Sequence, residues 1–181
     1  MKYERSKKMK KCCITVLIIT IIILSAMAIE PLQTPKKEYL RIHIRADSNE
    51  APAQTVKYKV KDAVVEYLIP FIAECKTKEQ AKTMLSERLE EVERVSDSVL
   101  LSNGYNYTAK ARLGAEEFPT RVYDSLTLEQ GIYDALIIEL GKGEGANWWC
   151  VVYPPLCFTG GEQTVYKSKI LEIINSFKSK T

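Results

Sequence analysis

The amino-acid sequence predicts an α+β domain, in which a mostly antiparallel sheet of about five strands packs with two to three helices, preceded by an N-terminal signal or transmembrane helix. Three observations lead to this expectation. Apolar and polar residues alternate over residues 40–46, two long segments repeat apolar residues at helical spacing, and the chain after Gly104 consists of short aromatic or β-branched runs separated by Gly, Pro and Asn. The predicted order of one strand, two helices and then several strands lacks the repeated strand–helix alternation of a doubly wound sheet.

The N-terminal segment has the organisation of an export signal. Residues 1–28 contain six basic residues and one acidic residue, and residues 12–29 form an almost uninterrupted apolar run that includes Ala26-Met27-Ala28 near its end. This charged, apolar and small-residue order predicts a secretory signal peptide with cleavage after Ala28. A retained membrane anchor is the alternative, because the run is almost long enough to span a bilayer. In either case we expect the domain to function outside the cytoplasm.

The charge of the remaining chain argues against a nucleic-acid partner. Of the 26 basic and 23 acidic residues, 20 basic and 22 acidic residues lie beyond residue 28, so the net charge of +3 comes from the N-terminal segment. Such a composition lacks the basic surface that binding to nucleic acid requires. The expected organisation is a signal or anchor at 1–28, a proline-containing linker at 29–38, a single globular domain at 39–160, and a C-terminal helix with a lysine tail at 161–181.

The first predicted elements of the domain are a strand and a helix. In residues 40–45, Leu, Ile and Ile alternate with Arg, His and Arg, which fits a strand with one buried and one polar face. A turn follows, and Ser48 or Asn49 is expected to cap a helix. That helix should run to about Leu68, because Pro70 interrupts the pattern.

The rest of the domain is expected to contain a second long helix, several strands and a last helix. Residues 77–102 repeat apolar residues at helical spacing and are followed by Asn103-Gly104, a typical helix end. Short connections between the following runs indicate mostly antiparallel pairing. The expected strands cover residues 105–113, 118–123, 132–140 and 148–153, and the last helix covers residues 162–177.

Few residues in the chain offer chemistry for catalysis. His43 is the one histidine, and Cys150 and Cys157 are the nucleophiles in the most distinctive setting, NWWCVVYPPLCF. A cysteine hydrolase would need one of these thiols within hydrogen-bond reach of His43. One histidine and widely spaced cysteines supply few zinc ligands, so we expect no metal, and no motif indicates another cofactor. The sequence therefore favours a protein that is not an enzyme.

Two local features of the NWWCVVYPPLCF region have structural interpretations. A disulfide between Cys150 and Cys157 would close a small loop around Pro154-Pro155 and stabilise it by about 2 to 3 kcal/mol. Export would permit oxidation, whereas Cys75 would remain unpaired, so the residues leave the bridged and the free forms open. The preceding glycine-rich residues 141–145 lack the lysine-serine pair of a phosphate-binding loop and are expected to form a hairpin turn.

Several stretches and their order resemble the stage II sporulation protein R family of endospore-forming bacteria. The stretches are LRIHIRADSNEAPAQTVKYKVKDAVVEYL, FPTRVYD and GIYDALIIELGKGEGANWWCVVYPPLCF, which span residues 40–158. Residues 141–158 are the most specific part of the resemblance. A glycine-rich turn followed by Asn-Trp-Trp-Cys and Pro-Pro-Leu-Cys-Phe would rarely arise by chance from the amino-acid composition. The chain departs from the family pattern at residues 47–49 and 129–131, where its residues remain compatible with turns.

The resemblance implies an exported signalling protein in the space between the forespore and mother-cell membranes. Its partner would be a membrane-embedded aspartic protease of the mother cell, which removes the pro-sequence from the precursor of sigma-E. The membrane itself would be contacted through the N-terminal segment if that segment is uncleaved. A non-enzymatic activator of this kind needs exposed aromatic area with polar anchors. The candidate residues are Trp148, Trp149, Tyr153 and Phe158.

Alternation along the strand places Trp148 and Trp149 on opposite faces, so we expect the two side chains to have different surroundings. Two other functions remain open at this point. One is a secreted cysteine-dependent hydrolase that uses Cys150 or Cys157 with His43, and the other is a purely structural role in the intermembrane space.

Overall fold

The computed structural model describes residues 38–123, 126–158 and 164–179 of the 181-residue chain. The predicted signal or anchor at 1–28, its cleavage after Ala28 and residues 29–37 of the linker lie outside these described residues. Within the described ranges, none of the helices is both long enough and apolar enough to cross a bilayer. The described residues confirm the α+β class, although the sheet and the helices differ in detail from the expectation.

The central sheet contains β1 (Leu40–Arg45), β2 (Ala109–Phe118), β5 (Gly131–Leu140) and β6 (Asn147–Tyr153), in the spatial order β2-β5-β1-β6. β1 pairs in parallel with β5 and antiparallel with β6, and β2 pairs antiparallel with β5. The expectation of a mostly antiparallel sheet of about five strands is therefore corrected to a mixed sheet of four. A parallel pair needs a long crossover, and local patterns do not reveal which strands such a crossover brings together.

A second sheet consists of β3 (Arg121–Tyr123) and β4 (Leu126–Leu128), which pair antiparallel. The single strand expected at residues 118–123 is wrong, because Phe118 ends β2 and Pro119 separates it from β3. Proline has no N–H group to contribute to a strand ladder, so it favours a break at this position.

The helices are α2 (Ala51–Ile72), α3 (Lys78–Ser86), α4 (Leu89–Ser102) and α5 (Thr164–Lys178), with a short 3-10 helix, η1 (Leu156–Phe158), after β6. The described residues thus contain four α-helices rather than two to three. The helix expected at residues 77–102 is divided near Arg88, whose φ of −122° and ψ of 14° are not helical. α2 continues through Pro70 and ends two residues later, where the missing N–H of proline removes one hydrogen bond from the last turn.

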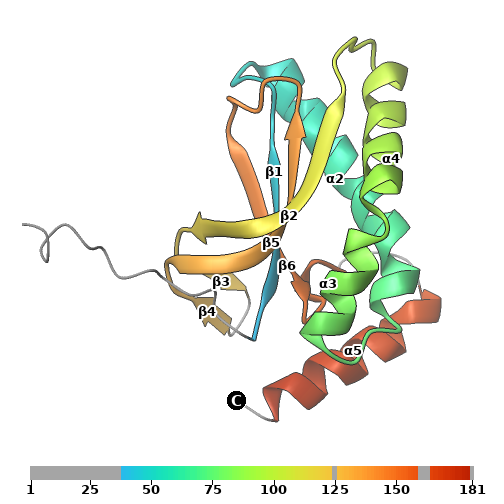
Figure 1. Ribbon diagram of the computed structural model, residues 1–181, viewed down its shortest axis with the longest axis vertical. Helices are drawn as coiled ribbons and strands as arrows, with labels where there is room; N and C mark the ends of the chain where they lie inside the picture. Colours follow the sequence, from blue (N-terminus) through green and yellow to red (C-terminus); the bar gives the residue numbers. More distant parts are fainter. Residues whose placement is uncertain (1–37, 124–125, 159–163, 180–181) are drawn as a thin grey trace, which may run out of the picture. The chain divides into compact units, whose positions relative to one another are not determined.

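The central strand β1 is buried on both faces of the sheet. α2, α3 and α4 lie on one side (Figure 1), where Ile42 and Ile44 pack with valines of α2 in the larger apolar cluster. The other side carries a smaller apolar cluster that includes Phe118 and is joined by Leu128 of β4. The expected polar face of β1 is therefore closed to solvent at Arg41 and His43, which these aromatic and β4 residues cover, whereas Arg45 is 29% exposed. His43 is only 3% exposed.

The glycine-rich turn after β5 packs against the turn that follows β1. The N–H of Lys142 donates a hydrogen bond to Asp47 Oδ1 at 2.9 Å, so the turn directs a backbone amide to a carboxylate of the chain itself. Gly141 has a φ of +58°, and a Cβ at this position would collide with the Asp47 carboxylate and meet the Tyr107 ring at 3.0 Å. Glycine is required here by both the backbone conformation and the close contact.

We expect Gly141→Ala to destabilise the domain by about 3 kcal/mol, because the new methyl group requires a left-handed backbone and overlaps Asp47. Gly104→Ala is a matched control, since its φ is +82° but no heavy atom lies within 4 Å of the added Cβ. It should destabilise the domain by about 1 kcal/mol. Urea-induced unfolding measures both effects, and equal losses would contradict a specific role for the Asp47 contact.

Candidate recognition site

The side of the sheet opposite α2 and α4 is called the polar face here, and it is defined by Arg41, His43, Arg45, Glu116 and Trp149. The first three lie on β1 at alternate positions, and the pairing of β1 with β6 places Trp149 directly beside His43. Glu116 comes from β2, on the far side of β5. Three strands therefore hold the residues of one site in a fixed register, which a loop-built site would lack.

His43 is held at the centre of the polar face. Its Nδ1 lies 2.5 Å from Glu116 Oε2, and its ring stacks on Trp149 with a centroid distance of 5.3 Å and meets the edge of Phe118 at 5.8 Å. With the Nδ1 proton directed to the carboxylate, Nε2 is the ring atom left for another interaction. Nε2 is buried and has no hydrogen-bond partner among the described residues.

Arg45 extends the same network toward the end of β1. It forms an ion pair with Glu116 and a second ion pair with Glu139, in which Nη1 lies 2.8 Å from Oε1. Glu116 therefore interacts with both His43 and Arg45, and the three groups fix one another. Charged hydrogen bonds of this kind orient side chains more strongly than neutral ones.

Arg41 is completely buried, although it has no carboxylate partner among the described residues. Its Nη2 donates a hydrogen bond to the hydroxyl of Tyr123 at 2.7 Å, and its guanidinium carbon lies 4.2 Å from the centre of the Phe118 ring and 4.9 Å from that of Tyr133. Burial lowers the pKa of Arg41, and the contact with Tyr123 opposes part of this change. The aromatic rings provide cation–π attraction in place of a counter-ion.

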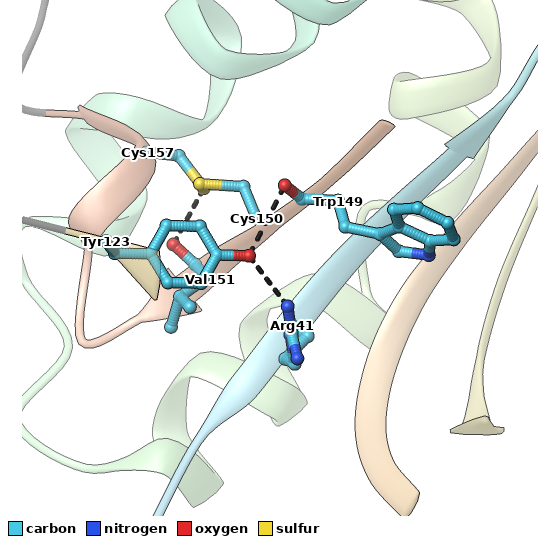
Figure 2. Close-up of a disulfide and its surroundings, with 6 residues drawn as sticks. All are labelled: Arg41, Tyr123, Trp149, Cys150, Val151 and Cys157. Atoms are coloured by element: carbon cyan, nitrogen blue, oxygen red, sulfur yellow. Dashed lines mark hydrogen bonds between the residues drawn. A yellow bond between two sulfur atoms is a disulfide. The ribbon is translucent and has the colours of Figure 1, made fainter. Parts of the chain in front are cut away.

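The Tyr123 hydroxyl joins β3 to two strands of the central sheet. Figure 2 shows it between Arg41 and the carbonyl oxygen of Trp149, to which it donates at 3.4 Å. Arg41 Nε and Nη1 have no acceptor among the described residues. In this part of the chain, the hydrogen bond to Tyr123 is therefore the one that the Arg41 side chain makes. The Tyr123 hydroxyl is therefore the polar contact that links β3 to Arg41, beside the stacking of Arg121 on Trp149 and the pairing of β3 with β4.

The two tryptophans lie in different surroundings, as alternation along β6 requires. Trp148 packs against the larger apolar cluster on the helix side, with Lys61 Nζ 5.9 Å from the centre of its ring. Trp149 lies on the polar face, partly buried, with the guanidinium of Arg121 over its ring at 4.6 Å. Its indole Nε1 is buried without an acceptor in the described part of the chain. Only Trp149 therefore belongs to the polar face.

The other two expected binding residues are not part of this face. Tyr153 is 7% exposed and donates its hydroxyl to the carbonyl oxygen of Lys76 at 2.6 Å, so it packs in the core between β6 and the start of α3. The side chain of Phe158 lies outside the described residues.

Cys150 and Cys157 are joined by a disulfide, with a Cα–Cα distance of 5.9 Å. Cys150 pairs with Ile42 and belongs to the helix-side cluster, whereas His43 points to the polar face. The remaining cysteine of the described residues, Cys75, is buried, and burial raises the pKa of its thiol. The structure therefore does not bring either Cys150 or Cys157 together with His43 as a nucleophile and base.

No group of three or more metal-binding side chains occurs within residues 38–123, 126–158 and 164–179. Sequence reasoning found His43 and Trp149 but missed Glu116, Arg121 and Tyr123. Glu116 lies two residues before the apolar Phe118 in β2, so the two side chains share one face of the strand. This spacing was a signal in the sequence by which Glu116 could have been found. The partners of Arg41 had no local signal, because Tyr123 is 82 residues away in the chain.

The fold and the site define an α+β domain with a polar, aromatic face on a mixed sheet. Residues 36–163 match the family model of stage II sporulation protein R, and the chain belongs to this family, as the sequence resemblance indicated. The chain is 31% identical over 129 residues to stage II sporulation protein R of Bacillus subtilis (strain 168). This match covers 71% of the chain and 57% of that relative. No solved structure has a significant similarity to the chain.

We expect Tyr123→Phe to destabilise the domain by about 2 kcal/mol, because Arg41 would be left buried without its hydrogen bond while the ring contact remains. Tyr58→Phe is the control, because Tyr58 is 49% exposed and its loss of a hydroxyl should change stability by less than about 0.5 kcal/mol. Thermal unfolding compares the two variants. A small effect of both would mean that Arg41 does not need Tyr123.

Proposed function

We propose that the protein is an exported sporulation signal that activates the membrane-embedded aspartic protease by which the mother cell processes pro-sigma-E. Membership in the stage II sporulation protein R family supports a role in sporulation. Export is supported by the basic, apolar and small-residue order of residues 1–28. The protein would then act in the space between the forespore and mother-cell membranes, released or held by its N-terminal segment.

The observation that favours a binding role is the environment of Trp149. A partly buried indole, whose N–H has no acceptor among the described residues, lies between His43 and the exposed Arg121 on a face whose side chains are fixed by ion pairs. Tryptophan and arginine are the side chains most often found at the energetic centre of protein interfaces. A fixed aromatic anchor loses little conformational entropy on binding, which favours affinity.

Activation by binding rather than by catalysis agrees with the arrangement of the cysteines. Cys150 is bridged and lies on the helix side of β6, so the hydrolase alternative lacks a thiol near His43 among the described residues. Without an adjacent nucleophile, a histidine oriented by a carboxylate does not make a catalytic triad. The same His43–Glu116 pair instead fixes the ring on which Trp149 stacks.

Direct activation is tested by producing the full chain, the protease and pro-sigma-E together in a bacterium that does not form spores. We expect the shortened sigma-E to appear only when all three are present and the chain is exported, because the binding face must reach the extracytoplasmic side of the protease. A chain without residues 1–28 is the control and should give no processing. Equal processing without the chain, or none with all three, would contradict direct activation.

Trp149→Ala should raise the amount of chain needed for half-maximal processing by about 30-fold, as expected for loss of an interface anchor worth about 2 kcal/mol. Trp148→Ala is the matched control, since it removes the same side chain from the opposite face of the same strand. It should change that amount by less than about three-fold. Resistance to proteolysis checks that both variants fold. Equal losses in two folded variants would exclude the polar face as the binding surface.

A further inference from the structure

The outer edge of β2 is closed by α4 over only part of its length. Asp97 Oδ1 accepts the N–H of Ala109 at 2.6 Å, and Glu93 Oε1 accepts the N–H of Ala111 at 2.8 Å. Four helical residues advance by about 6 Å and two strand residues by about 6.8 Å, so carboxylates four residues apart can reach alternate amides of the strand. These two contacts satisfy amides that point away from β5.

In the described part of the chain, the second half of the same edge has no such acceptors. β2 pairs with β5 without a shift in register, so the outward amides continue at Leu113, Ala115 and Glu117. The next α4 residue in the series is Leu89, which begins the helix and carries no acceptor. Among the described residues, these three N–H groups have no hydrogen-bond partner. Figure 1 shows the second half of β2 curving away from α4.

We propose that this open edge, residues 113–117, pairs antiparallel with the same edge of a second copy of the chain, with a two-fold axis at Gly114. An unpaired strand edge is a template for another strand, and an antiparallel pair of identical strands satisfies two-fold symmetry. With Gly114 opposite Gly114 of the partner subunit, Leu113 lies opposite Ala115 of the partner subunit. Both residues point their amides outward, so the pairing uses the free groups.

The charges beside Gly114 favour a second copy as the occupant. In this register each Arg112 lies opposite Glu116 of the partner subunit, and opposite charges across strands stabilise pairing. The Arg112 side chain is 52% exposed, and its Nη2 lies 3.8 Å from Glu116 of its own chain. Its Nη1 lies 3.0 Å from the position of a Cβ on Gly114. The guanidinium therefore already lies over the proposed axis, and a side chain at position 114 would require it to move aside.

Neighbouring registers fit less well. Outward amides occur at every second residue, so the axis can move only to Leu113 or Ala115. An axis at Leu113 places Ala115 of the partner subunit opposite Ala111, whose N–H is already bound by Glu93, so Leu113 is then the one residue that pairs with a free amide on both sides. An axis at Ala115 places Arg112 opposite Phe118 of the partner subunit and Glu116 opposite the partner subunit's Gly114, so these two charges do not face each other across the strands. The axis at Gly114 pairs the free amides of Leu113 and Ala115 and also places Arg112 opposite Glu116, whereas Glu117 then faces Ala111, whose N–H is bound by Glu93.

Gly114→Cys in the full, exported chain tests the register. Directly opposed residues of this kind have Cα atoms about 4.5 Å apart, within the range for a disulfide. Lys110→Cys is the matched control, because it is exposed on the same strand and face, but its two copies would lie about 27 Å apart. We expect at least about ten-fold more covalent dimer from Gly114→Cys on non-reducing electrophoresis, above the background of the unmodified chain.

A charge variant tests the same interface without a new cysteine. Arg112→Glu would place two carboxylates opposite each other, so it should abolish the dimer seen in sedimentation of the otherwise unchanged chain, whereas Lys110→Glu should not. A monomeric unmodified chain would overturn the proposal. Equal cross-linking at positions 110 and 114 would also overturn it, as would a Gly114→Cys adduct with a different protein in place of the dimer.

Discussion

The burial of β1 on both faces of the sheet is the constraint on which most of the structure depends. Its sequence alternates apolar residues with Arg41, His43 and Arg45, so covering both faces removes cationic or polar groups from water. Such groups are tolerated in a protein interior only when other groups hydrogen-bond or neutralise them. Tyr123 on β3 and Glu116 on β2 serve this purpose. The small second sheet and the second half of β2 thus supply the partners that the buried polar side chains of one central strand require.

The elements that the sequence predicted well are those with strong local patterns. Periodicity and turn residues predicted the strand that begins at residue 40, the end of the long helix at its glycine, and the strands near residues 132–140 and 148–153. The parallel pairing of β1 with β5 could not be predicted in the same way, because it joins segments about 90 residues apart. The buried state of Arg41 was missed for a similar reason. Its aromatic partners come from β2, β3 and β5, and an arginine at an alternating position normally indicates a solvent-facing side.

β6 combines three roles at consecutive positions. Trp148 contributes to the helix-side core, Trp149 to the polar face, and Cys150 to a covalent link with the following turn. Strand geometry separates these roles, because successive side chains point to opposite faces. The two adjacent tryptophans therefore lie on opposite sides of the sheet, although their positions in the sequence suggest a single aromatic surface. The same alternation separates Cys150 from His43, and Cys157 is bonded to Cys150, so the cysteines and the histidine are two separate structural features.

The bridge between Cys150 and Cys157 makes the stability of the domain depend on the compartment that contains it. The two residues are seven positions apart. Closing a loop of this size lowers the conformational entropy of the unfolded chain and so raises its free energy by about 2.5 kcal/mol. Cytosolic reductants keep such cysteines as thiols, whereas an oxidising exterior allows them to pair. If the chain is exported as proposed, it would therefore be easier to unfold before it crosses the membrane and harder to unfold afterwards. Such a difference favours translocation in an unfolded form and resistance to degradation at the destination.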